Sequence, residues 1–483
     1  MKNSFVRFLL LLCLSLPTFG QATQRFERLS TASGLSQSTI NKIIQDHRGF
    51  LWFATADGLN RYDGHSFVIY RHDPGDANTL SGSDISTLLE DEDGNLWVAA
   101  RSSGLNKINL KTGKITRFSR GPKGIDFSSL TISSLLNVGK HRIYAAVIGL
   151  GVLVFDTQKN TFLPNESELK NPLVKDVVRL YKHSNGSIWM GTRTGQLISY
   201  VGNHSFIPFD FSGKSMASNF RVRALFEAKN GDLLIGTEGK GLFRFNPQNQ
   251  HFRSVFYQSA QPLSRQNIVT SLVKDANENL WIGTDNGVYT LKGEDFKQVR
   301  HIPSNPDPDL GITSFSVMSM FTDSNRNTWI GTWEAGLNIS FFQKSRFSVL
   351  RYKPNTFQGL LSNKVTSLSA GDDRGVWIGS NVGLSFFEHK TGKVEHVINQ
   401  SVENKLNVTS GFDVNLLQAM PDGTVWVAAW ARGLFHFSPP NTLQPFPYRI
   451  GESGMNLTAL FKDQNRLLLG TQTKGLFAFD LAK

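Results

Sequence analysis

Short runs of alternating apolar and polar residues recur along the whole chain, and clusters of Asp, Asn and Gly separate them. The runs of one representative repeat lie at 85–89, 96–100, 106–110 and 114–118. An alternation of period two between such turns is typical of β-strands joined by hairpins. Each repeat is therefore predicted to form four antiparallel strands.

The second run of the repeat has a sequence signature that can be followed through the chain. It reads LWFAT at 51–55, LWVAA at 96–100, IYAAV at 143–147, IWMGT at 188–192, LLIGT at 233–237, LWIGT at 280–284, TWIGT at 328–332, VWIGS at 376–380, VWVAA at 425–429 and LLLGT at 467–471. Four short strands in about 46 residues match the dimensions of a β-propeller blade. Ten copies therefore predict a chain built almost entirely of blades.

The predicted fold class is all-β, a β-propeller of about ten four-stranded blades. No stretch of about ten residues shows the period of an amphipathic helix. Seven repeats would close a first ring over residues 23–345, and residues 346–483 would hold three further blades of an incomplete second propeller. A single larger ring is the alternative.

The bulky residue of the signature predicts how neighbouring blades pack. Gly or Ala follows it two positions later in every copy, as in Trp52/Ala54 and Trp281/Gly283, and residues two apart share a strand face. A large ring beside a missing side chain would let the next blade approach and interlock. Seven of the nine Trp hold this position and are predicted to be structural. The polar turns are interpreted as hairpin turns, because no repeat gathers the ligands of a calcium loop.

Residues 1–22 have the composition of a secretory signal peptide. Lys2 and Arg7 precede an apolar run over 8–16, and small residues near Ala22 fit cleavage after it. The run is too short to span a bilayer and remain there. The sequence therefore predicts an exported, periplasmic protein.

The formal net charge of the chain is +12, and two of these positive charges lie in the predicted signal peptide. Export also decides which partners this charge could attract. An exported protein rarely meets cytoplasmic nucleic acid, so no nucleic-acid partner is expected. The single cysteine, Cys13, also lies in the signal peptide, so disulfides and Cys-based zinc sites are excluded from the mature chain. Leu12 precedes it where a lipoprotein would have a small residue.

The most specific segments of the repeat are GLSQSTI at 34–40 and DHRGFLWFATADGLNRYDG at 46–64. They resemble the two-component-regulator propeller repeats, which form the periplasmic sensor region of hybrid histidine kinases and of some diguanylate cyclases. The resemblance covers residues 25–483. It implies a ligand-binding sensor of oligosaccharides or related breakdown products. Full-length members are anchored in the inner membrane and usually carry two seven-bladed propellers, an immunoglobulin-like domain, a membrane helix and an output domain.

The sequence ends at Lys483, just after a tenth repeat and without those later modules. We therefore expect a truncated sensor, whose kinase or cyclase activity would lie in an absent C-terminal region. Signalling would then need a downstream domain or a partner protein. A homodimer stays open.

Candidate ligand-binding residues gather on one predicted face. The turn after the signature strand shares that face with the long connection into the next blade, and both carry variable residues, which suits function on loops. The candidates are Trp333, Glu334, Trp430, Arg432, Arg101, Arg193, Glu238, Lys240, Asp285 and Asp57. An exposed Trp could stack on a sugar, and Arg or Lys could receive a carboxylate or sulfate from an acidic ligand. The alternative is that the two Trp fill wide loops and the charges form a solvated rim.

No pattern of catalytic or metal-binding residues stands out. The eleven His lack metal-ligand spacing, and neither a nucleophile elbow nor a phosphate-binding loop is present. We therefore expect no catalytic residue, no metal and no cofactor, and a small-molecule or oligosaccharide ligand that is bound without being transformed. Two alternatives stay open: a polysaccharide-active glycosidase or lyase on a propeller scaffold, and a protein-binding propeller scaffold.

Overall fold

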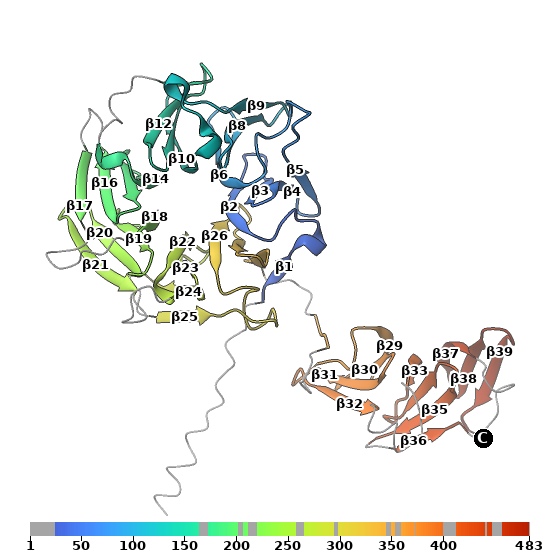
Figure 1. The fold of residues 1–483 in the computed structure, drawn as a ribbon. Coiled ribbons are helices and arrows are strands. Elements are labelled where there is room, and N and C mark those ends of the chain that lie inside the picture. The colour runs from blue at the N-terminus through green and yellow to red at the C-terminus, as the bar shows by residue number, and fades with distance from the viewer. Residues whose placement is uncertain are drawn as a thin grey trace, which may run out of the picture. The chain divides into compact units, whose positions relative to one another are not determined.

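The computed structural model describes residues 25–163, 172–200, 206–210, 220–256, 265–293, 298–343, 349–352, 359–371, 373–398, 412–439, 442–446 and 456–482. The predicted signal peptide at 1–22 lies outside these residues. The chain divides into two compact units, Met1–Lys344 and Ser345–Lys483, which are described separately (Figure 1). Within the described residues the helices are short 3-10 turns, and none of them is long and apolar enough to cross a membrane.

The first unit is a ring of seven four-stranded antiparallel sheets, numbered here as blades 1 to 7 (Figure 1). Blades 1 and 2 comprise β2 (Ile40–Gln45), β3 (Leu51–Thr55), β4 (Gly58–Tyr62) and β5 (Phe67–Tyr70), then β6 (Ile85–Glu90), β7 (Asn95–Ala100), β8 (Gly104–Asn109) and β9 (Ile115–Phe118). Blades 3 and 4 comprise β10 (Ile132–Gly139), β11 (Arg142–Val147), β12 (Gly151–Asp156) and β13 (Thr161–Phe162), then β14 (Val177–Lys182), β15 (Ile188–Thr192), β16 (Gln196–Tyr200) and β17 (Phe206–Asp210).

Blades 5 and 6 comprise β18 (Val222–Glu227), β19 (Leu233–Thr237), β20 (Leu242–Asn246) and β21 (His251–Phe256), then β22 (Val269–Lys274), β23 (Leu280–Thr284), β24 (Gly287–Lys292) and β25 (Gln298–Ile302). Blade 7 comprises β26 (Val317–Thr322), β27 (Thr328–Thr332), β28 (Leu337–Ser340) and β1 (Glu27–Leu29). The short 3-10 helices are η1 (Thr31–Ser33), η2 (Pro122–Gly124), η3 (Phe127–Ser129), η5 (Pro172–Val174) and η7 (Arg265–Asn267).

The ring closes through the N-terminal strand. Blade 7 takes three strands from its own repeat, and β1 pairs with β28 as the fourth, from Glu27 opposite Ile339 to Leu29 opposite Leu337. The innermost strand β26 also contacts β2 of blade 1. Four strands from a single repeat were predicted for every blade, and blade 7 differs because its outer strand comes from the other end of the ring.

Arg28 fixes this closing strand to the preceding connection. Its guanidinium donates hydrogen bonds to the carbonyl oxygens of Asn305 (2.5 Å), Pro306 (2.6 Å) and Gly311 (3.1 Å). Phe26, which is 2% exposed, packs into the core of blades 6 and 7. The N-terminal segment is therefore an integral part of the ring.

The second unit holds three sheets. Two have four strands each, β29 (Val365–Ala370), β30 (Gly375–Ser380), β31 (Gly383–Glu388) and β32 (Val394–Ile398), then β33 (Val414–Ala419), β34 (Val425–Ala429), β35 (Gly433–Ser438) and β36 (Thr442–Pro445). The third comprises β37 (Leu457–Asp463), β38 (Arg466–Thr471) and β39 (Leu476–Asp480). The last repeat thus shows three of the four predicted strands within the described residues.

In the ring, the glycine of the signature strand is in contact with the next blade. A Cβ atom on Gly283 would lie 2.7 Å from Val317 of blade 7, and one on Gly331 would lie 2.6 Å from Ile40 of blade 1. Both distances are shorter than a carbon–carbon contact allows, so these positions admit no larger side chain. The interlocking predicted from the sequence is therefore confirmed, and Gly331 extends it across the ring closure.

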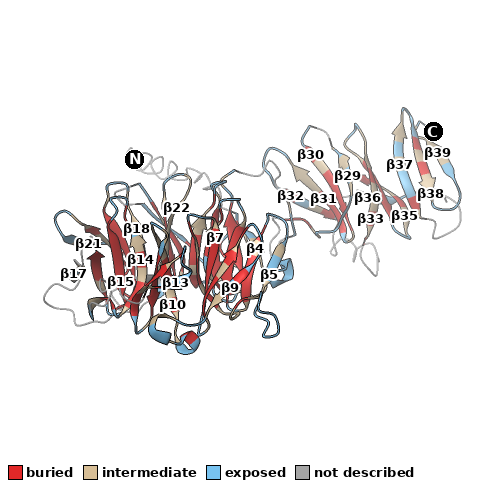
Figure 2. Ribbon diagram, turned by 90° about the horizontal axis from the view of Figure 1, so that it is seen from above, coloured by how far each residue is buried: buried red, intermediate tan, exposed pale blue. Residues whose placement is uncertain are grey.

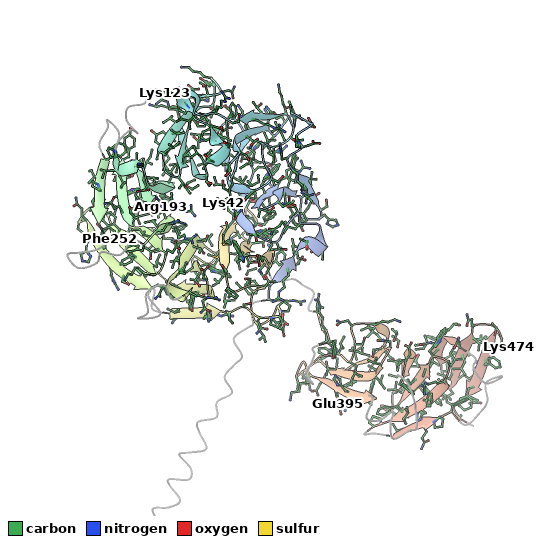
Figure 3. All side chains as sticks on the ribbon, in the orientation of Figure 1. Lys42, Lys123, Arg193, Phe252, Glu395 and Lys474 are labelled. Atoms are coloured by element: carbon green, nitrogen blue, oxygen red, sulfur yellow. The ribbon has the colours of Figure 1, made fainter. Side chains whose placement is uncertain are left out.

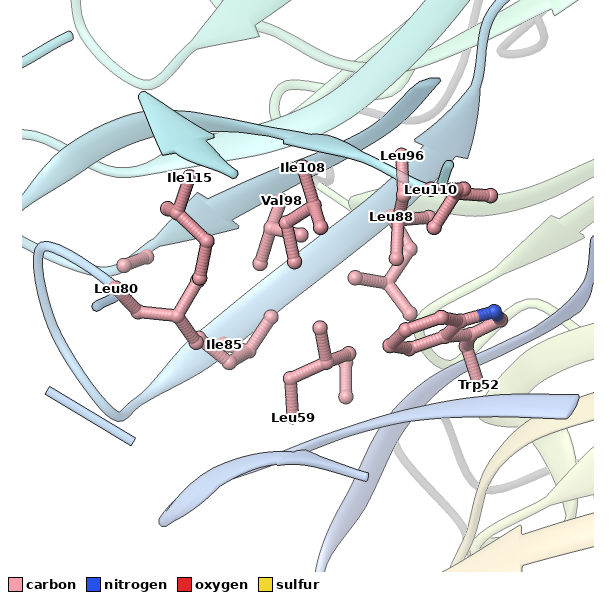
Figure 4. Close-up of a cluster of buried hydrophobic side chains, with 12 residues drawn as sticks. Trp52, Leu59, Leu80, Ile85, Leu88, Leu96, Val98, Ile108, Leu110 and Ile115 are labelled. Atoms are coloured by element: carbon pink, nitrogen blue, oxygen red, sulfur yellow. The ribbon is translucent and has the colours of Figure 1, made fainter. Parts of the chain in front are cut away.

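The core lies between consecutive blades. Trp52 and Leu59 of blade 1 pack against Ile85 and Leu88 of blade 2, as the close-up in Figure 4 shows. All seven signature Trp are buried, with 0–8% of their surface exposed. Buried residues accordingly follow the strands of the first unit in Figure 2.

Aspartates of the polar turns hold the Trp indoles. In blade 2, the Asp91 carboxylate accepts hydrogen bonds from the Trp97 indole nitrogen at 2.7 Å and from the backbone N–H of Asn95 at 2.8 Å. Asp46, Asp275 and Asp323 accept from the indoles of Trp52, Trp281 and Trp329 in the same way. The turn residues therefore serve the packing of the signature Trp as well as the hairpin.

Both end blades of the second unit expose positions that are buried in the first unit. Leu368 is 64% exposed, whereas Leu88 at the equivalent position of β6 is 3% exposed. Leu476 is 69% exposed, whereas the equivalent Leu105 is fully buried. A propeller blade buries these positions only when another blade covers them, so both end faces of the three-blade stack are open.

Candidate functional site

The turns after the signature strands and the connections into the next innermost strands meet on one face of each unit. In blade 2, the backbone N–H of Arg101 donates to the carbonyl of Asp84, the residue just before β6. The same bond joins Arg193 to Asp176, Glu238 to Arg221, Trp333 to Ser316 and Trp430 to Asp413. The face that the sequence predicted for the candidate residues is thus a single structural feature, here called the connection face.

The two exposed Trp belong to different units. Trp333 follows β27 in blade 7 and is 49% exposed, and Trp430 follows β34 in the second unit and is 50% exposed. The backbone N–H of the neighbouring Glu334 donates to the Thr39 hydroxyl of blade 1 at 3.2 Å. Trp333 therefore lies where the ring closes, on the connection face.

Several candidate charges are paired across this face. The Arg101 guanidinium lies 3.1 Å from the Asp84 carboxylate, and Arg193 lies 3.1 Å from Asp176. In each pair the acidic residue precedes the basic one by 17 positions. Exposed pairs of this kind contribute little stability, so their main effect is to orient the guanidinium groups at the rim.

In blade 5 the order of the charges is reversed, because the basic Arg221 comes first and the acidic Glu238 follows it. Its carboxylate accepts a hydrogen bond from Arg223 at 3.0 Å and lies 3.9 Å from Arg221, 17 positions before it. Blade 5 therefore brings two guanidinium groups and one carboxylate to the inner part of the connection face.

The other candidates are held individually. Asp57 pairs with Arg71 at 3.0 Å, and the Asp285 carboxylate accepts from the Ser316 hydroxyl at 2.9 Å. The backbone N–H groups of Lys240 and Arg432 donate to the Thr237 hydroxyl and to the Ala429 carbonyl, respectively. The ten candidates are therefore spread along the connection faces of both units.

Two cations that no motif marks, Lys42 and Arg179, lie on the innermost strands β2 and β14. Both occupy the third position of the strand, opposite the small residue of the signature: Lys42 pairs with Ala54 and Arg179 with Gly191. The equivalent residues in the other five blades are Thr87, Ser134, Ala224, Ser271 and Ser319. Aligning the repeats against one another would have revealed these two long cations in a set of small residues.

Arg179 reaches across neighbouring blades. Its Nε donates to the carbonyl of Arg223 in blade 5 at 2.6 Å, and its Nη1 donates to the carbonyls of Ser133 in blade 3 at 3.2 Å and Val178 at 2.9 Å. Its side chain therefore crosses the inner wall of the ring. Lys42 lies on the same wall, on the inner side of the ring in Figure 3.

The inner wall is electrostatically positive. Burial, and then the charges of Arg223, Arg221 and Arg101, lower the pKa of Arg179 to about 10, so it stays protonated at neutral pH. Desolvation by the surrounding strands, and then the charge of Arg179, lower the pKa of Lys42. Solvent reaches Lys42 from the axis of the ring, but the surrounding wall still removes part of its hydration. In both groups the second cause is the charge of neighbouring cations, so several positive side chains lie near one another on this wall.

A separate cavity of about 330 Å³ lies between blades 5 and 6 on the opposite face. Most of its charged groups are already in ion pairs, because Lys229 and Lys274 share Glu278 at 3.3 Å each and Arg244 pairs with Asp232, while Lys292 also lines the cavity. We therefore place the candidate site on the connection face and the inner wall. Within the described residues no group of three or more His, Cys, Asp or Glu side chains could hold a metal ion.

This geometry defines a β-propeller that presents charged side chains on one face and along its axis. Comparison with known proteins agrees. The family described as two component regulator propeller matches residues 34–57, 79–102 and 263–286. A 56-residue stretch is 48% identical to histidine kinase P4 of Formosa agariphila, over 12% of this chain and 4% of that protein.

Solved structures extend the likeness of fold to nearly the whole chain. The extracellular domains of two hybrid two component systems from B. thetaiotaomicron match 95% of this chain, with TM-scores of 0.59 and 0.54 at 22% and 20% identity. The chain covers 59% of each of those domains. Three segments of the chain thus match the two-component-regulator propeller family, and the predicted all-β propeller fold is confirmed.

Proposed function

We propose that the chain is the ligand-sensing region of an extracytoplasmic signalling protein and that it acts by binding. The observation that carries this proposal is the collection of oriented charges, including Arg101, Arg193, Arg223 and Glu238, on the connection face of a ring of sensor-type repeats. Propellers present function on loops held by a rigid scaffold, and these residues come from three different blades.

The ligand is an oligosaccharide or a related small molecule, with acidic sugars favoured. Guanidinium groups receive carboxylates and sulfates through charge-assisted hydrogen bonds. Trp333 adds an exposed ring at the same face, and such a ring can stack on a sugar. Trp430 and Arg432 would play the corresponding part in the second unit.

Signal output follows from a difference in affinity. A ligand shifts a conformational equilibrium only when it binds one arrangement better than the other, so the bound propeller must favour one arrangement of a downstream domain or partner protein. We place the protein in the periplasm, exported by residues 1–22. N-terminal sequencing of the secreted chain would test the export step, with Thr23 expected as the first residue.

Isothermal titration calorimetry with neutral, uronate-containing and sulfated oligosaccharides tests the proposal. We expect saturable binding of at least one acidic member without product formation, weakened by Trp333→Ala or Arg193→Met. Val299→Ala, which truncates an exposed side chain on an outer strand, is the matched control and should bind normally.

Other outcomes of this titration would overturn the proposal in different ways. Turnover of an oligosaccharide would show a polysaccharide-active enzyme. Absence of binding to every sugar, together with capture of a specific protein, would show a scaffold. Normal sugar binding by the Trp333→Ala and Trp430→Ala variants would show that the site lies elsewhere.

A further inference from the structure

The inner wall of the first unit differs from an ordinary propeller wall at two of its seven equivalent positions. Two of the small residues at this position bond to the next blade: the Ser134 hydroxyl accepts the backbone N–H of Leu180, and the Ser271 hydroxyl accepts that of Met320. Lys42 and Arg179 carry no acceptor atom at the end of the side chain and cannot make this bond. Arg179 instead contacts the neighbouring blades through its guanidinium donors, and the Lys42 side chain makes no such contact within the described residues.

Neither cation is neutralised within the described part of the chain. The connection-face carboxylates of blades 2, 4 and 5 are committed elsewhere, Asp84 to Arg101, Asp176 to Arg193 and Glu238 to Arg223. No described carboxylate lies within the 4.0 Å ion-pairing distance of Lys42 or Arg179. Arg179 has only carbonyl oxygens as partners, and Lys42 has no hydrogen-bond partner among the described side chains.

Such an arrangement is costly in the absence of a counter-charge. Arg179 is half-buried and so partly removed from water, whereas Lys42 is exposed. The two like charges also repel each other across the wall. The low dielectric of a protein-lined site also strengthens any attraction that an anion would gain there. A wall that gathers Lys42 and Arg179 is therefore suited to holding an anion.

We propose that the axis of the first unit is an oxyanion-binding site, in which Lys42 and Arg179 hold a carboxylate or sulfate group that enters from the connection face. Blade 5 keeps a net positive charge beside the approach, because Arg221 and Arg223 share the single carboxylate of Glu238, and this charge favours the entry of anions. The evidence for the site is the position of Lys42 and Arg179 on the innermost strands, and it does not depend on the proposed function. Only the identification of its natural ligand as an acidic sugar rests on the proposed sensor function.

Calorimetry of the full chain at low ionic strength, with sodium sulfate and sodium glucuronate as probes, tests the site. We expect saturable binding of both anions, and a dissociation constant about tenfold or more higher in Lys42→Met, because one charge-assisted hydrogen bond contributes on that order. Lys111→Met removes the same charge from an exposed turn on the opposite face and should bind within about twofold of the natural chain.

Folding of the variants can be separated from binding. The Lys42 ammonium makes no hydrogen bond to a described residue, so Lys42→Met should unfold at a temperature equal to or above that of the natural chain. Arg179→Lys keeps the charge but loses the paired carbonyl contacts, so it should retain more sulfate affinity than Arg179→Met. If Arg179→Met fails to fold, the Lys42→Met and Arg179→Lys results decide the question.

Two results would overturn the proposal: absence of saturable sulfate and glucuronate binding, or affinities that are unchanged in Lys42→Met. The outcome is separable from that of the proposed function. Oligosaccharide binding that does not depend on Lys42 would refute the axial site and leave the sensor standing. Sulfate binding that depends on Lys42, with no oligosaccharide bound, would support the axial site and refute the oligosaccharide sensor.

Discussion

At the residue scale, the hydrogen bond between a turn aspartate and a buried indole joins the hairpin to the core. The Asp91 carboxylate accepts hydrogen bonds from four donor groups. These are the backbone N–H groups of Asp93 and Asn95, the side-chain amide of Asn95 and the indole N–H of Trp97. We predict that Asp91→Ala lowers the free energy of unfolding by about 1–3 kcal/mol or more, because it leaves buried donors unpaired. Urea denaturation measures this loss. Asp93→Ala in the same turn is the control, and equal stability of the two variants would contradict the assignment.

A second residue-scale prediction concerns acid stability. Burial raises the pKa of Asp232, but hydrogen bonds from Asn230, Arg244 and Asn246 outweigh it and hold the pKa below its usual value. A carboxyl with a lowered folded pKa stabilises the protein fully above its unfolded pKa of about 4, and this stabilisation is lost as the pH falls below that value. Urea midpoints should therefore fall less steeply below about pH 4 in Asp232→Asn than in the natural chain. Identical pH profiles would refute this role.

The residue scale also shows what the sequence could and could not predict. The pairing of Trp281 with Gly283 was enough to predict interlocking blades, because strand periodicity alone puts both on one face. Lys42 and Arg179 were not found, because their significance depends on which strand is innermost and on what lies across the axis. The partners of Arg101 and Arg193 were missed for a related reason, since 17 intervening residues hide the pairing.

At the scale of elements, the N-terminal strand is the piece that completes the ring. Phe26→Ala should cost about 3–5 kcal/mol, as for other large side chains in a core, because Phe26 is buried among Trp281, Ile302 and Ile312. Thermal unfolding of the first unit would report the loss. Phe341→Ala removes a 48% exposed ring and should change little, so an equal effect of both variants would argue against a closing strand.

The origin of this strand was not predictable from local pattern. Three residues, Glu27–Leu29, are too few to show a period of two, and their partners on β28 lie about 310 positions away. The ten signature strands, by contrast, are each bounded by clear turn residues and were placed correctly. Elements with their own local signal were therefore predictable, and those defined only by closure of the ring were not.

At the scale of the whole molecule, equivalent positions of the repeat contribute differently to the free energy of unfolding in the two units. Leu88→Ala should cost about 2–5 kcal/mol, whereas Leu368→Ala should change stability by no more than about 0.5 kcal/mol, because only Leu88 is covered by another blade. Denaturant unfolding of both variants compares them directly. A large loss for Leu368→Ala would show that the first face of the second unit is covered in solution.

The central claim is that the first unit binds its ligand's anionic group on the axis of the ring, between Lys42 and Arg179. Crystals of the chain grown with sodium selenate, an anomalously scattering analogue of sulfate, test it most directly. We predict an anomalous peak on the axis, within hydrogen-bonding distance of the Lys42 ammonium and the Arg179 guanidinium. Selenate found only at other positions, with the axis occupied by water, would contradict the account.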